Sequence, residues 1–102
     1  MKYLSIQIQP DSQTNVTEQE LKFLLEKNGY TPEIETGNDD GPYINILTPT
    51  DNLKKLWVLV QGFLNDNNDL KKHFIVTCEG SRGWDNYLLL HSPPKSEKLD
   101  EL

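Results

Sequence analysis

The side chains best suited to binding chemistry lie in one short stretch, CEGSRGWDNYLLLH, at residues 78–91. Arg82, Trp84 and Asp85 stand there beside two glycines, between two runs of apolar residues. Tryptophan and arginine are enriched among the hot spots of protein interfaces, and glycine lets a chain reverse at low steric cost. The stretch is therefore predicted to form a β-hairpin whose turn, at residues 80–85, presents these three side chains to a partner.

Trp84 has two interpretations. If its ring folds back on Tyr30 or Pro49, which the expected topology places at the same end of the domain, the tryptophan is structural. If the ring stands in solvent, it is the strongest binding candidate in the chain. We expect the ring of Trp84 to be packed and the side chain of Arg82 to be exposed.

The remaining reactive residues do not form a recognisable catalytic arrangement. Cys78 alternates with Phe74 and Val76, so it is predicted to face the core as a small apolar residue rather than to act as a nucleophile. His73 and His91 end the last two expected strands, without the spacing of a zinc site. The glycine-bracketed turns also lack the strand, lysine and helix context of a phosphate-binding loop. We therefore expect no catalytic activity, no metal and no cofactor.

Several aspartates are expected to gather at the end of the domain opposite the hairpin turn. Hard cations such as Ca²⁺ prefer carboxylate oxygens, but the segment NDNNDLKKHFIV lacks the central glycine and the final glutamate of a calcium-binding EF-hand loop. A cation site, a docking site for a basic partner and simple solvated turns all stay open for this end. The aspartates are Asp11, Asp39, Asp40, Asp66 and Asp69.

Composition limits the classes of partner. Ten lysines and arginines stand against sixteen aspartates and glutamates, a net charge of −6, which disfavours binding to nucleic acid and to anionic membranes. The single cysteine excludes an internal disulfide. The first residues, MKYLSIQIQP, alternate apolar and polar side chains, unlike a signal peptide, and no apolar run approaches the roughly 20 residues of a membrane span. We expect a cytoplasmic protein that binds another protein.

The apolar periodicities predict the element order β-α-β-β-α-β-β. The first helix is expected to begin at a capping box formed by Thr17 and Glu20 and to end at Gly29, and the second helix to begin at Thr50 or Asp51. This order predicts an α+β fold, a ferredoxin-like β-α-β-β-α-β plan with an extra C-terminal strand, in which two helices cover one face of an antiparallel sheet. Residues 1–91 would form one globular domain and residues 92–102 a flexible tail. The strands are expected at residues 3–9, 32–36, 43–48, 74–79 and 87–91.

The sheet face without helices is predicted to carry aromatic side chains. Some RNA-binding proteins stack bases on such a face, but three glutamates here place negative charge where phosphates would lie. A second copy of the chain, forming a homodimer, or a protein partner suits this face better, and a half-wet sheet in a monomer is the plain alternative. The aromatic side chains are Tyr3, Tyr43 and Tyr87, and the glutamates are Glu33, Glu35 and Glu79.

These observations favour a small acidic protein-interaction module without catalytic activity. Its size, acidity and element order resemble those of small bacterial immunity or adaptor proteins and of small-ligand regulatory domains, a likeness of fold class that implies no particular site residues. The alternative is a regulatory domain that binds a small ligand between a helix end and the sheet edge, or at a dimer interface. A more distant alternative is a small hydrolase, which requires Glu79 and His91 to converge in a cleft.

Overall fold

The computed structural model describes most of the chain as an α+β structure. The described residues are 1–8, 14–38, 42–67, 73–92 and 99–100. The elements follow in the order β1 (Lys2–Ile8), α1 (Thr14–Lys27), β2 (Glu33–Asn38), β3 (Pro42–Thr50), α2 (Leu53–Asp66), β4 (Phe74–Gly80) and β5 (Gly83–His91).

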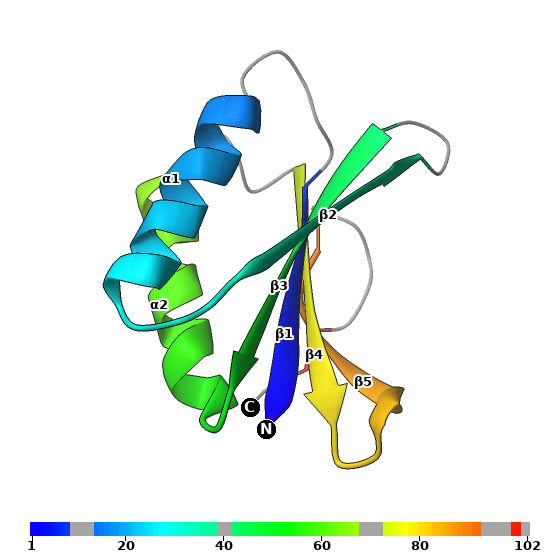
Figure 1. Cartoon of the computed structure of the whole chain (residues 1–102). Helices are drawn as coiled ribbons and strands as arrows, with labels where there is room; N and C mark the ends of the chain where they lie inside the picture. Colours follow the sequence, from blue (N-terminus) through cyan, green and yellow to red (C-terminus); the bar gives the residue numbers. More distant parts are fainter. Residues whose placement is uncertain (9–13, 39–41, 68–72, 93–98, 101–102) are drawn as a thin grey trace.

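The five strands form one sheet in the order β2-β3-β1-β4-β5, with every neighbouring pair antiparallel. Both helices lie on the same side of this sheet, and among the described residues no helix covers its other face (Figure 1). The predicted α+β class, with an antiparallel sheet and two helices, is confirmed. The strand order leaves β2 and β5 as the two edges, so β5 is the strand farthest from β2.

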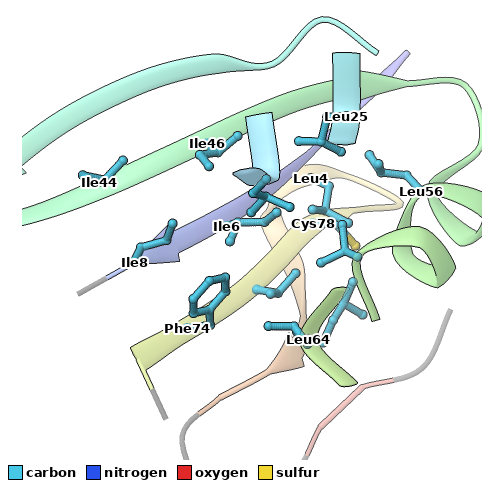
Figure 2. Close-up of a cluster of buried hydrophobic side chains, with 14 residues drawn as sticks. Leu4, Ile6, Ile8, Leu25, Ile44, Ile46, Leu56, Leu64, Phe74 and Cys78 are labelled. Atoms are coloured by element: carbon cyan, nitrogen blue, oxygen red, sulfur yellow. The ribbon is translucent and has the colours of Figure 1, made fainter. Parts of the chain in front are cut away.

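The core lies between the helices and the sheet. Alternate residues of β1 and β4, such as Ile6 and Val76, are fully buried, and the strand side chains point toward the helices (Figure 2). Cys78 is one of these buried residues, which confirms the prediction that it serves as a small core side chain. Burying each large apolar side chain stabilises the fold by roughly 1.5–3 kcal/mol. The apolar core consists of Leu4, Ile6, Ile8, Leu21, Leu25, Ile44, Ile46, Leu56, Val60, Leu64, Phe74, Val76, Cys78 and Leu90.

The two helix starts differ from the predicted ones. Helix α1 begins at Thr14, about one turn before the predicted cap at Thr17, because a capping-box pattern is a local signal that a helix can extend past. Helix α2 is capped by Asn52, whose Oδ1 accepts a hydrogen bond from the Lys55 backbone N at 3.1 Å. The predicted cap Thr50 does not cap the helix. Its Oγ1 instead accepts a hydrogen bond from the backbone N of the capping residue, Asn52, at 3.0 Å.

The end of α1 follows its sequence signal. The backbone N of Tyr30 donates to the Leu25 O at 3.0 Å, and that of Gly29 donates to the Glu26 O at 3.1 Å. This pair of bonds is the Schellman motif, which needs a residue in the left-handed region, here Gly29 with φ of 88°. The predicted stop at Gly29 is therefore confirmed.

Candidate functional site: the hairpin surface

The β4–β5 hairpin is tighter than the sequence suggested. Gly80 pairs with Gly83, so the turn consists of Ser81 and Arg82 alone, and the predicted turn at residues 80–85 is wrong. The side chain of Asn86 holds this turn: its Oδ1 accepts from the Arg82 backbone N at 2.7 Å, and its Nδ2 donates to the Ser81 Oγ at 2.9 Å. These contacts come from a residue that the periodicity did not single out.

The shorter turn moves two of the predicted contact residues onto a strand. Trp84 and Asp85 belong to β5, in the segment between Gly83 and Leu88 where the register with β4 shifts. The Trp84 side chain is 44% exposed and is not among the described side chains packed against the core. The expectation that Trp84 is packed is therefore wrong: Trp84 is exposed, on an edge strand whose pairing with β4 is irregular at this point.

The turn itself presents the arginine. Arg82 is exposed in the two-residue turn, as expected, and Asp85 is exposed three residues further along. The hairpin extends beyond the helical layer, at the lower right of Figure 1. Arg82, Trp84 and Asp85 therefore lie on one exposed β-hairpin.

Two of the three predicted tyrosines adjoin this hairpin. Leu4 pairs with Cys78, and Cys78 pairs with Leu88, which places Tyr3 and Tyr87 beside the hairpin end of β4. The Tyr3 backbone N donates a hydrogen bond to the Glu79 Oε2. The Tyr87 side chain is 57% exposed, while Tyr3 is half-buried. We call the five residues Arg82, Trp84, Asp85, Tyr87 and Tyr3 the hairpin surface.

Tyr43 does not join this surface. On β3 it lies six residues from Pro49, the partner of Tyr3, and this spacing corresponds to roughly 20 Å along a strand. Its ring covers Gly37 of β2, because a Cβ built on Gly37 would collide with the ring. An aromatic side chain over an edge-strand glycine is a recognised stabilising device of β-sheets. The three tyrosines predicted to act together are thus split between two ends of the sheet.

The groups proposed for acid–base chemistry are not brought together. His91 pairs with Val76, three residues along β4 from Glu79, which is roughly 10 Å. The Glu79 carboxylate also accepts the bond from the Tyr3 backbone N. The convergence of Glu79 and His91 that a hydrolase would need is therefore not found.

The predicted aspartate cluster falls almost entirely outside the described residues. Of its members only Asp66 is described, as an exposed residue at the last position of α2. Asp11, Asp39, Asp40 and Asp69 lie outside. Within the described part of the chain, no three His, Cys, Asp or Glu side chains come close enough to hold a metal ion.

Cys78 is the described titratable group with a resolved change in acidity. Burial raises the pKa of its thiol above the ordinary value of 9.0; nearby Lys2 opposes this change, and Asp100 and Glu79 add to it. The folded thiol therefore holds its proton more tightly than the unfolded thiol does. Its contribution to stability is fully present below the unfolded pKa and is lost as the pH rises through the folded pKa.

We expect the raised pKa of Cys78 to make the stability of the wild type depend on pH differently from that of the Cys78→Ala variant. Above about pH 9, where the unfolded thiol ionises, the free energy of unfolding of the wild type should fall more steeply with pH than that of Cys78→Ala. Urea unfolding at several pH values between neutral and alkaline measures both slopes, and the other ionising groups cancel in the comparison. Equal slopes in the two chains would contradict the assignment.

The fold and site define the chain as a small α+β protein with a five-stranded antiparallel sheet, two helices and an exposed aromatic hairpin. Comparison with protein-family models finds no match, and comparisons with curated proteins and with solved structures find none either. Among the described residues, neither helix combines the length and the apolar character that crossing a membrane requires.

Proposed function

We propose that this chain is a small cytoplasmic protein-interaction module without catalytic activity, and that it binds a partner protein through the hairpin surface. The observation that carries the proposal is the exposure of two large aromatic side chains, Trp84 at 44% and Tyr87 at 57%, on one edge strand. Exposed aromatic side chains beside an arginine have the composition of an interface hot spot.

The way the hairpin is held supports this use. The turn is fixed by the two hydrogen bonds from Asn86, and Trp84 and Tyr87 are part of β5 rather than of a long loop. A binding surface that is already ordered loses little conformational entropy when a partner docks. Arg82 and Asp85 are exposed residues of opposite charge on the same hairpin, and such charges would set the orientation of the partner more than its affinity.

We also propose that the fold is a ferredoxin-like arrangement with β5 as the added strand. The support is the path of the chain: α1 joins β1 to β2, two strands that flank β3, and α2 joins β3 to β4, which flank β1. Such split β-α-β units define the ferredoxin-like plan. In this scheme β5 is an addition beyond the common sheet, and it carries most of the hairpin surface.

The test is a double substitution, Trp84→Ala with Tyr87→Ala. We expect it to weaken binding of the partner by roughly 1,000-fold, because each hot-spot residue contributes about 2 kcal/mol. The partner is isolated by affinity capture from the native host, and its affinity for each variant is then measured by isothermal titration calorimetry. Both side chains are exposed, so we expect the melting temperature to stay close to that of the wild type.

The matched control is Phe23→Ala, which removes a 68% exposed aromatic side chain from α1, away from the hairpin surface. This variant should bind the partner as the wild type does. The proposal fails if the double variant binds as tightly as the Phe23→Ala chain. We also propose that the sheet face without helices allows two copies of the chain to form a homodimer. Sedimentation equilibrium of the same samples measures this self-association.

A small-ligand regulatory domain is the second candidate, and one observation favours it. A cleft of about 410 Å³ is lined by residues of α2, by Leu90 of β5 and by Leu99 and Asp100, and its volume is within the size range of ligand sites. A small ligand bound there would raise the melting temperature, because it binds only the folded chain. A metabolite library that leaves the melting temperature unchanged would count against this candidate.

A further inference from the structure

The outer edge of β5 is partly closed by residues from the far end of the chain. The Leu89 backbone N donates to the Asp100 Oδ2 at 2.8 Å, and the Leu89 backbone O accepts from the Asp100 backbone N at 2.7 Å. An edge strand offers a row of unpaired N–H and C=O groups. A single residue, Asp100, therefore satisfies both groups of Leu89, much as an added strand would.

A cleft lies directly beside this edge. Helix α2 contributes one stripe of side chains at helical spacing, and β5 contributes Leu90, which is buried although it lies on an edge strand. Leu99, the neighbour of Asp100, lines the same cleft and is 45% exposed. The leucine thus forms part of the wall of a cleft whose lining is partly apolar and partly polar. The α2 stripe consists of Lys54, Trp57, Val58 and Gln61.

We propose that the β5 edge and the α2 cleft together form a recognition site for an extended peptide that carries a leucine–aspartate pair. The chain's own Leu99 and Asp100 occupy this site from within the same molecule. The chemistry of the occupant follows from these contacts: the aspartate bonds both backbone groups of Leu89, and the leucine lines the cleft together with residues of α2. One of these bonds comes from the Asp100 main chain and the other from its carboxylate; a longer peptide that also made main-chain bonds to the neighbours of Leu89 on β5 would bind by β-strand addition.

The occupancy by the chain's own residues regulates the site. A tethered segment competes at an effective concentration in the millimolar range, so even weak contacts keep it bound. A partner peptide must displace it and gains by pairing with more of β5 than Leu89 alone. If the tethered segment fills the site about nine-tenths of the time, the intact chain binds a competing peptide about ten-fold more weakly than a chain whose segment is released.

The experiment uses full-length chains and a labelled peptide, KSEKLDEL, with the sequence of residues 95–102. We expect the Leu99→Ala/Asp100→Ala chain to bind this peptide about ten-fold more tightly than the wild type, as measured by fluorescence anisotropy. The same peptide with alanine at the positions of Leu99 and Asp100 should bind neither chain. Equal binding to both chains, or binding to neither, would overturn the proposal.

Two further measurements separate the site from other effects. In the wild type the amide of Leu89 should exchange with solvent more slowly than in Asp100→Ala, because the Asp100 carboxylate protects it; equal rates would also overturn the proposal. In the Leu99→Ala/Asp100→Ala background, Val58→Glu should abolish peptide binding, whereas Phe23→Glu, which changes an exposed residue of α1, should not.

This site is distinct from the hairpin surface, and the two proposals fail separately. The Trp84→Ala/Tyr87→Ala substitutions, added to the Leu99→Ala/Asp100→Ala chain, should leave peptide binding unchanged. The prediction of a flexible tail from residue 92 on stays a prediction, because residues 93–98 and 101–102 lie outside the described part.

Discussion

Replacing Gly80 by alanine is expected to lower the free energy of unfolding by about 3 kcal/mol. A Cβ at this position would collide with the backbone O of Asn86 and would lie 2.9 Å from its Oδ1 and 3.0 Å from its carbonyl carbon. Backbone atoms cannot swing aside as the end of a flexible side chain can. Moving Asn86 would also strain its hydrogen bonds to Ser81 and Arg82.

The control for this substitution is Gly62→Ala in α2. A Cβ at Gly62 meets nothing within 4 Å among the described residues, so alanine should raise the free energy of unfolding by about 1 kcal/mol through its higher helix propensity. Urea unfolding of the two variants and the wild type measures both changes. A Gly80→Ala chain as stable as the wild type would mean that β5 does not approach Gly80 as described.

The regular parts of the fold could be predicted because they follow local patterns. Strict alternation around Ile6 and around Val76 marks strands with one buried face, and both residues are fully buried. Gly29 ends α1 through bonds made within the helix itself. Where the deciding contacts are close in sequence, the sequence alone is sufficient.

The hairpin surface could be predicted only in part, because contacts outside the periodic pattern decide its geometry. The glycines and the exposed Arg82 were identified from their types. The early start of β5 depends on Asn86, whose side chain reaches back across the turn, and asparagine in such a stretch is usually read as a loop residue. The exposure of Trp84 follows from that shift. The residue types around Trp84 are compatible with both a packed and an exposed ring, so the sequence alone could not decide between them.

The contact between Leu89 and Asp100 joins residues eleven positions apart, across a segment without any apolar period. No sequence pattern links them. Together with the hairpin surface, this contact makes β5 the strand that carries both proposed binding sites, one through its exposed side chains and one through its outer backbone edge. The inner strands β1, β3 and β4 supply the buried residues that hold β5 in place.

The chain has three phenylalanines, which differ in how deeply they are buried. Replacing each by alanine therefore compares the stabilising effect of core and surface positions for the same side chain. Phe74 on β4 is fully buried, so Phe74→Ala should lower the free energy of unfolding by about 4 kcal/mol through lost transfer energy and the cavity left behind. Phe63 on α2 is half-buried, and its loss should cost about 1–2 kcal/mol. Phe23 on α1 is exposed, and Phe23→Ala should stay within about 0.5 kcal/mol of the wild type.

The double variant Phe63→Ala/Phe74→Ala measures the contact between α2 and β4 directly. The two ring centroids are 6.5 Å apart with an interplanar angle of 38°, which is within the range of favourable aromatic pairs. The double variant should therefore lose about 1 kcal/mol less than the sum of the single losses in urea unfolding. Strict additivity would mean that the rings do not contact each other. In that case α2 would not be held against β4 as described, and the cleft between α2 and β5 would lose its fixed wall.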